Sequence, residues 1–317
     1  MTWLPFICLF CGLFIGLRTV SSRIFQAIDL ITNFSLILLM LTIGANIGIN
    51  NSVISNLSKI GFNCMFISLS AIIFSIALTF VLEKTFLPLE SIRNSLNFND
   101  VNLENEIPIE AEEPKTSPLI WIMPLSIILG IILGYFLIPE PYYFLLNHML
   151  TISLIILYTS VGVSLGSHRK IFGYIKLLGF RIIYLSVSIF IGSLLGGFIS
   201  SLILNIPINI AILSSSGMSY YSITGAYLAQ VYGVEAGTYG FIVNVMREFF
   251  TVLLLPLIIK ISKGSPIAAG AAGNMDTMLV PVTKFVGSEL GLVALITGTI
   301  LTFSVPIILP TLTKLFF

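Results

Sequence analysis

The sequence predicts an all-α integral membrane protein with about eight transmembrane helices and two further broken or re-entrant segments. Hydrophobic residues make up 56% of the 317 residues and charged residues 9%, whereas about 25% of an average soluble chain is charged. The mean hydropathy is +1.05. The apolar residues also form long blocks, each close to the ~20 residues that cross a bilayer as a helix. These observations exclude a water-soluble globule.

Eight of the blocks are predicted spans, at residues 3–20, 30–49, 60–82, 119–138, 144–165, 177–204, 241–261 and 290–316. The first has no basic region before it and no clear small-residue cleavage site, so we interpret it as a span and not as a signal peptide. Two weaker segments, 207–230 and 266–285, are more polar and are interrupted by Gly and Pro. They suit broken or re-entrant helices, which membranes tolerate where protein or water lines them. Cys8, Cys11 and Cys64 lie inside spans and are predicted to be packing residues.

The distribution of charge predicts the orientation in the membrane. Lys and Arg concentrate in the first, third, fifth and seventh loops. By the positive-inside rule these loops are cytoplasmic, which places both termini outside in a multi-pass protein of the cytoplasmic (inner) membrane. Residues 84–117 are rich in Glu and predict an acidic cytoplasmic linker, either a solvated tether or a regulatory segment. The net charge of +1 gives no sign of a nucleic-acid partner, and none is expected.

Shifted by 118 residues, the sequence matches itself without a gap. SLILLMLTIGANIG at 35–48 falls on SLIILYTSVGVSLG at 153–166. Further matched pairs are Trp3/Trp121, Gly12/Gly130, Gly16/Gly134, Gly44/Gly162, Gly48/Gly166, Ser68/Ser186 and Ser75/Ser193. Each copy holds three spans, so the second copy is inverted, as in many secondary transporters. The predicted parts are a first three-helix repeat (1–83), the linker (84–117), an inverted repeat (118–204) and a C-terminal transport region (205–317).

Charged residues inside predicted spans are the first candidate functional residues, because such charges are costly in lipid. Arg247 and Glu248 interrupt FIVNVMREFFTVLLLPLIIK, and Asp276 lies in the weak segment AAGAAGNMDTMLVPV. Adjacent helix residues point about 100° apart, so Arg247 and Glu248 each need another partner. Either they join a fixed ion-pair network, or Glu248 binds a proton or a cationic group. We favour the second interpretation.

Residues 214–225, SSSGMSYYSITG, place eight hydroxyl side chains between two apolar segments. Two broken segments in one half of a transporter are the best indication of its binding site. We therefore expect these hydroxyls to bind exposed backbone ends and a polar solute, although they could simply satisfy neighbouring helices. The candidate solute ligands are Ser214, Ser215, Ser216, Ser219, Tyr220, Tyr221, Ser222 and Asn244.

The run LNIPINIAILSSSGMSYYSITG, followed by REFFTVLLLPLI and GNMDTMLVPV, resembles the lysine exporter family (LysO-type) of bacterial inner membranes. The resemblance is strongest over roughly residues 200–315. It implies eight spans, both termini outside, and export of L-lysine and its toxic analogues. It also implies an essential intramembrane acidic pair, of which Glu248 matches one member by its Arg-Glu context. The other is expected near the second span, but residues 42–51 hold Asn46, Asn50 and Asn51 instead. Either Asp276 is the second acid, or the substrate or coupling ion differs.

Our sequence-based hypothesis is a secondary transporter that exports L-lysine by proton antiport, with no enzymatic activity and no cofactor or metal. Glu248 would alternate between a proton and the substrate's ammonium group, with Asp276 and Arg247 beside it. Broken helix N-termini would favour the substrate carboxylate. One alternative is a sodium-coupled transporter of another small amino-acid-like solute, with Asn46, Asn50 and Asn274 as ion ligands. Another is a non-transporting membrane scaffold.

Overall fold

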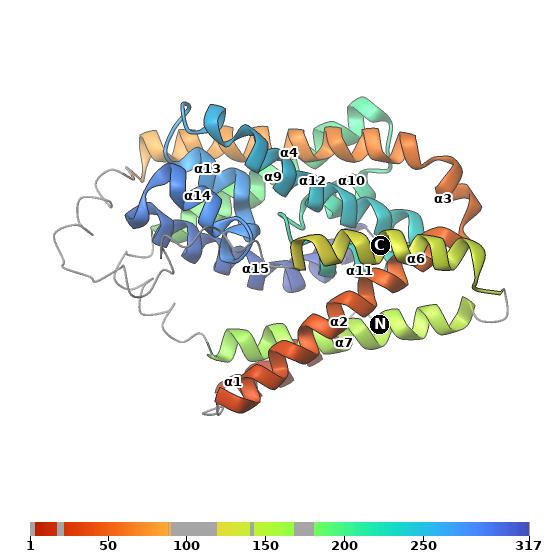
Figure 1. Ribbon diagram of the computed structural model, residues 1–317. Helices are drawn as coiled ribbons and strands as arrows, with labels where there is room; N and C mark the ends of the chain where they lie inside the picture. The colour runs from red at the N-terminus through yellow and green to blue at the C-terminus, as the bar shows by residue number, and fades with distance from the viewer. Residues whose placement is uncertain are drawn as a thin grey trace.

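In a computed structural model of the protein, the regular secondary structure of the described residues is helical (Figure 1). The described residues are 4–17, 22–87, 89, 119–139, 143–167 and 181–316. Most of the predicted acidic linker lies outside them. The helices are α1 (Leu4–Leu17), α2 (Ser22–Ile49), α3 (Asn51–Ser55), α4 (Leu57–Thr85), α6 (Leu119–Phe136), α7 (Tyr143–Ser167), α9 (Ile182–Leu204), α10 (Ile208–Ser215), α11 (Tyr221–Tyr232), α12 (Val234–Ile258), α13 (Gly264–Gly270), the 3₁₀ helix η3 (Ala271–Met275), α14 (Leu279–Val286) and α15 (Ser288–Phe316).

Among the described residues, six helices are long and apolar enough to cross a membrane: α2, α4, α7, α9, α12 and α15. The remaining two predicted spans correspond to α1 and α6. The described apolar helices at these two places, Phe6–Leu17 and Leu125–Phe136, are shorter. The protein is therefore a multi-pass membrane protein, and the total of eight spans stays a prediction.

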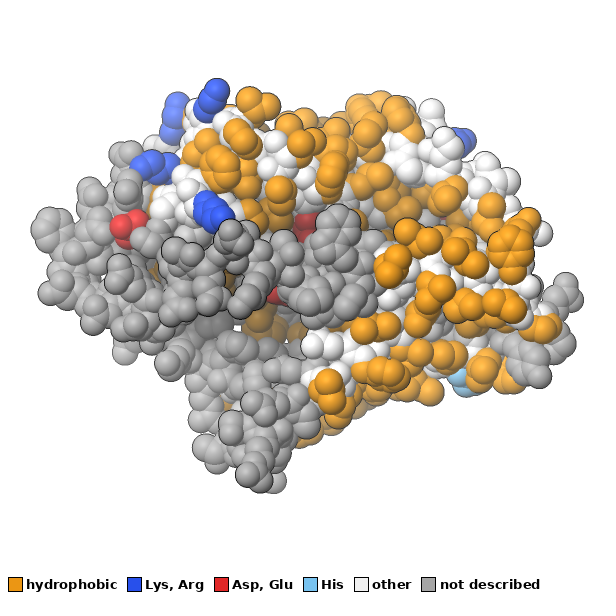
Figure 2. All heavy atoms as spheres, in the orientation of Figure 1, with side chains coloured by type: hydrophobic (Ala, Val, Ile, Leu, Met, Phe, Trp, Pro, Cys, Tyr) orange, Lys and Arg blue, Asp and Glu red, His pale blue; other side chains and the backbone are white. Residues whose placement is uncertain are grey.

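The surface agrees with a lipid environment. Large apolar side chains such as Phe14, Phe34 and Leu30 are 70%, 67% and 73% exposed. Hydrophobic side chains cover much of the described surface in Figure 2, whereas Lys and Arg side chains gather mainly toward one end. A water-soluble protein rarely exposes apolar patches of this extent.

The helices form two groups that pack against each other (Figure 1). In the first group, α1 packs on α7 and α2 packs on α6. A Cβ at Gly44 would lie 3.0 Å from the Cα of Gly130, and a Cβ at Gly162 would lie 3.0 Å from the Cα of Gly12. Glycine at these four positions therefore lets the paired helix backbones touch, as small residues do in membrane helix pairs.

The second group is built on the antiparallel pair α4 and α9. Here Gly192 and Gly196 of α9 lie against the backbone of Ser75 and Ala71 of α4. Around this pair lie α10 to α15, which include both segments that the sequence predicts to be broken.

The first broken segment, 208–232, forms a helical hairpin. α10 runs back along α9, because Gly197 of α9 lies against Ala211 of α10. α11 then runs antiparallel to α12, with Gly237 of α12 against Ala229 of α11. Gly233, at φ 89° and ψ 177°, makes the turn between α11 and α12. The chain therefore enters and leaves this hairpin at one end of the bundle.

The second broken segment, 264–286, forms a hairpin from the opposite end. The N–H of Gly264 at the start of α13 donates to Glu83 Oε2 near the end of α4. α13 and α14 lie side by side at that end (Figure 1), and α14 returns antiparallel to α15, with Gly291 against Thr283. The two hairpins meet at their tips, where the N–H of Ala272 donates to the carbonyl of Met218 at 2.9 Å.

Candidate functional site

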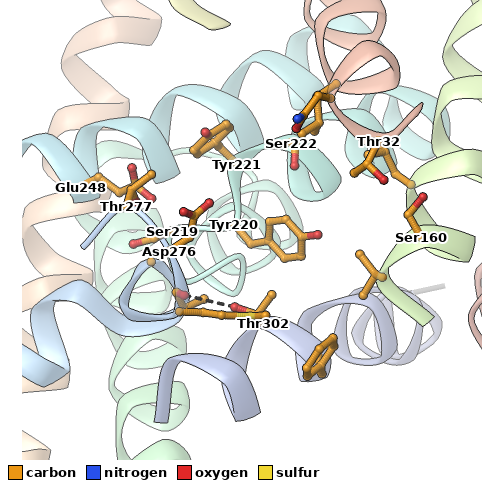
Figure 3. A pocket seen from close by; sticks show the side chains of 18 of the residues that line it. Thr32, Ser160, Ser219, Tyr220, Tyr221, Ser222, Glu248, Asp276, Thr277 and Thr302 are labelled. Carbon is orange, nitrogen blue, oxygen red and sulfur yellow. Dashed lines mark hydrogen bonds between the residues drawn. The ribbon is translucent and has the colours of Figure 1, made fainter. Parts of the chain in front are cut away.

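A cavity of about 340 Å³ lies where the hairpin tips meet the first helix group (Figure 3). Its volume is within the range of small-molecule sites, roughly 300–1,000 Å³. The second helix group contributes the Ser219–Ser222 turn, Glu248 of α12, residues 272–273 and 275–277, and Thr302 and Phe303 of α15. The first group contributes Ile28, Thr32, Asn33 and Leu36 of α2 and Leu157, Ser160 and Val161 of α7.

Glu248 and Asp276 line the same end of this cavity (Figure 3). Glu248 is half-buried near the middle of α12, and Asp276 follows η3 and is exposed. Gly273 leaves room for the Glu248 side chain, because a Cβ there would lie 3.0 Å from Glu248 Oε1. Two carboxylates from separate segments therefore converge on one accessible space, as the sequence hypothesis requires of an acidic pair.

The hydroxyl-rich turn supplies one wall of the cavity through Ser219, Tyr220, Tyr221 and Ser222. Asn244 of α12 holds this turn from behind. Its Oδ1 accepts from the Ser219 N–H at 2.8 Å, and its Nδ2 donates to the Ser214 carbonyl at 2.9 Å. Ser219 has φ 83°, a backbone conformation that costs a non-glycine residue free energy. Asn244 stabilises that conformation at the cavity wall.

Several predicted ligands lie outside the cavity lining. Ser215 and Ser216 donate to the carbonyls of Ile212 and Leu213 in their own helix. Asn274 donates to the Ile267 carbonyl, which braces the second hairpin. These contacts correspond to the less favoured interpretation, in which polar side chains satisfy nearby backbone. Ser214 and Asn244 belong to the same supporting layer.

The two asparagines of α2 and its following turn are also away from the cavity. Asn46 Nδ2 donates to the Thr42 carbonyl at 3.0 Å. Asn50 is the N-cap of α3 and accepts from the Val53 N–H. Neither of them lines the cavity beside Glu248, and Asn274 does not line it either.

Arg247 points away from Glu248, as the helical spacing predicts, but its partners differ from the expected ion-pair network. It is 1% exposed and donates to the hydroxyls of Ser75 and Ser193 and to two carbonyls of α13. These partners are neutral oxygens, and within the described part of the chain no carboxylate pairs with Arg247. The ion-pair interpretation of this residue is corrected accordingly.

Sequence reasoning missed the opposite end of the cavity. Thr32 and Asn33 of α2 and Ser160 of α7 face it from the first helix group. Their spans carry other hydroxyls that only bond the preceding helical turn, so sequence gave no means of separating these three. No Lys, Arg or His is among the described residues that line the cavity. The described residues also contain no cluster of three His, Cys, Asp or Glu side chains that could hold a metal ion.

Apolar helices define a multi-pass membrane protein, and its two opposed hairpins enclose a carboxylate-lined cavity of the size of small-molecule sites. Comparison with known proteins agrees. The family described as "Lysine exporter LysO" matches residues 6–97 and 125–313. Because this match covers most of the sequence, the chain belongs to the lysine exporter LysO family.

Two relatives illustrate the similarity. "Lysine exporter LysO" of Escherichia coli (strain K12) is 31% identical over 157 residues, which is 50% of this chain and 52% of the relative. "Putative lysine exporter" of Haemophilus influenzae is 29% identical over 119 residues, which is 38% of this chain and 61% of the relative. The chain thus spans about half the length of the first relative and about three fifths of the second.

Proposed function

We propose that this protein exports L-lysine and lysine analogues across the cytoplasmic membrane. The observation that carries the proposal is the convergence of Glu248 and Asp276 on one end of a solute-sized cavity whose described lining holds no Lys, Arg or His. Such a site favours a positively charged solute. Family membership and the names of the two relatives support lysine as that solute.

The two ends of the cavity match the two ends of lysine. The side-chain ammonium group binds between Glu248 and Asp276. The amino-acid head group lies toward Tyr220, Thr32 and Ser160, which offer neutral hydrogen-bonding groups at the other end (Figure 3). The N-terminus of α11 faces the same space and favours the substrate carboxylate.

Export of a cation from a negatively charged interior is opposed by about 2.3 kcal/mol per 100 mV. We infer that an inward proton supplies the coupling, with Glu248 holding either the proton or the ammonium group. Sodium coupling is the second candidate, favoured by one observation: Asn274 Oδ1 is buried and has no hydrogen-bond partner among the described residues. Transport in sealed vesicles under a proton gradient or a sodium gradient separates the two.

We also propose eight spans with an inverted repeat at an offset of 118. Two contacts between equivalent residues support it: Ser35 donates to the Ser153 carbonyl, and the Ser75 and Ser193 hydroxyls bond each other at 3.1 Å. The cation-rich end in Figure 2 lies over α13 and α14, which supports a cytoplasmic origin for the second hairpin. In this orientation both termini lie on the side of the inner membrane that faces away from the cytoplasm.

Resistance to a toxic lysine analogue tests the proposal in cells. Expression should protect a strain that lacks its own lysine exporter, and Glu248→Gln should remove the protection. Glu235→Gln is a matched control, because Glu235 is exposed in the first turn of the same helix. Full protection by a normally expressed Glu248→Gln variant would contradict the assignment.

A further inference from the structure

Arg247 is a fully buried cation whose hydrogen bonds connect three helices. Nη1 donates to Ser193 Oγ of α9 at 2.7 Å, and Nη2 donates to Ser75 Oγ of α4 at 3.2 Å. Nε and Nη2 also donate to the carbonyls of Ala269 and Ala268 at 3.1 and 3.0 Å. Charge-assisted hydrogen bonds are stronger than neutral ones, and their number fixes a guanidinium in one orientation.

The two serines stand at the closest approach of α4 and α9. Their hydroxyls lie 3.1 Å apart, and both are within hydrogen-bonding distance of the Ile189 carbonyl. A Cβ at Gly192 would lie 2.5 Å from the Cα of Ser75, so these helices cannot come closer. Ser75 and Ser193 therefore form a rigid acceptor pair for Arg247.

The two alanine carbonyls belong to the last turn of α13, in the second hairpin. Carbonyls in a last turn lack partners within their helix, and a cation there is favourable. The chain continues from α13 through η3 to Asp276. The bonds from Arg247 thus fasten the arm that carries Asp276 to the α4 and α9 pair.

The same bonds restrict α12. Arg247 faces α4, α9 and α13, and Glu248 is the next residue and faces the cavity. Because neighbouring side chains point about 100° apart, fixing one sets the direction of the other. Arg247 does not line the cavity, so its effect on a substrate is indirect.

We propose that Arg247 is a positioning residue, which uses Ser75 and Ser193 to hold Glu248 and Asp276 together in the place, relative to α4 and α9, where they bind substrate. This inference rests on the proposed export function, since it assigns the geometry of the same acidic pair. Without the serine acceptors, Arg247 keeps only its bonds to α13. The second hairpin and α12 then shift together relative to α4 and α9.

The test compares two double variants of equal size. Ser75→Ala with Ser193→Ala removes both acceptors. Ser68→Ala with Ser186→Ala is the control, because these serines are also buried and also 118 residues apart in α4 and α9, and their hydroxyls have no hydrogen-bond partner among the residues that the structure describes. In proteoliposomes the first variant should raise the half-saturating lysine concentration about tenfold and shift the pH profile of transport. The control should leave both unchanged.

The two single variants test the contribution of each serine. Ser193→Ala should have the larger effect, because its bond to Arg247 is 2.7 Å long and the Ser75 bond is 3.2 Å long. Size-exclusion chromatography in detergent confirms that each variant is folded. Unchanged half-saturation and an unchanged pH profile in the Ser75→Ala, Ser193→Ala protein would overturn the proposal.

A labelling measurement separates this proposal from the transport function. Cys8, Cys11 and Cys64 are replaced by alanine, and Asp276→Cys is labelled with the cationic reagent 2-aminoethyl methanethiosulfonate. The labelling rate should change several-fold when Ser75 and Ser193 become alanine and stay constant in the control pair. A wild-type protein that moves no lysine would refute the export function, whereas a constant labelling rate would refute the positioning role.

Discussion

Replacing Gly44 by alanine should push α2 and α6 apart. The added Cβ would lie 3.0 Å from the Cα of Gly130 and would overlap the carbonyl oxygen of Ile127. Carbon atoms pack best at about 3.5–4.0 Å, so the two helices must separate by roughly 0.5–1 Å. A gap of that size removes about a quarter to a half of the dispersion energy of each affected contact.

The expected cost is about 1–3 kcal/mol, as for other overpacked sites. Gly162→Ala should cost a similar amount, because its Cβ meets the Cα of Gly12 at the same 3.0 Å. The assay is thermal unfolding of the purified protein in detergent, followed by intrinsic fluorescence. Both variants should unfold several degrees below the wild type.

Gly61→Ala is the matched control for this prediction. Gly61 lies within α4, and a Cβ there meets nothing within 4 Å. Alanine at such a helix position is favoured over glycine by up to about 1 kcal/mol, so this variant should unfold at or slightly above the wild-type temperature. Equal unfolding temperatures for Gly44→Ala and Gly61→Ala would refute the close contact between α2 and α6.

Three further predictions concern the site and the linker. Asp276→Asn should lower lysine export at least tenfold while preserving folding, because a charged partner of the ammonium group is lost. Efflux of radiolabelled lysine measures this, and efflux by the variant at the wild-type rate would count against the acidic pair. Asn244→Ala should destabilise the protein by about 2–4 kcal/mol, since the Ser219 N–H and the Ser214 carbonyl lose a buried partner; an unchanged unfolding temperature would argue against this supporting role. Deletion of residues 90–113 should leave efflux intact, whereas loss of efflux in a normally expressed deletion would indicate a regulatory or docking linker.

Sequence predicted the parts of the fold that depend on local chemistry. Long apolar blocks identified α2, α4, α7, α9, α12 and α15, and Pro and Gly indicated that the segments around 216–220 and 271–278 are interrupted. Charged side chains within a membrane cost free energy, and on that ground the sequence pointed to Glu248 and Asp276 as functional candidates. The structure brings both to one cavity.

The remaining features depend on contacts between distant segments. Ser193 and Ser75 are 54 and 172 residues from Arg247, and a serine in an apolar helix bonds its preceding turn by default. Thr32, Asn33 and Ser160 reach the cavity only because the two helix groups pack together. The sequence suggested Asn46, Asn50 and Asn274 as ligands of one ion. In the structure each of the three side chains makes a hydrogen bond with backbone of its own segment.

The most direct test of the central claim uses purified protein in liposomes loaded with labelled lysine. We expect lysine efflux to accelerate when the outside is made acidic, to ignore a sodium gradient, and to carry protons inward that a pH-sensitive dye detects. Glu248→Gln should abolish both fluxes, and Glu235→Gln should keep both. Efflux that is indifferent to the proton gradient, or that persists in Glu248→Gln, would contradict proton-coupled export through this carboxylate.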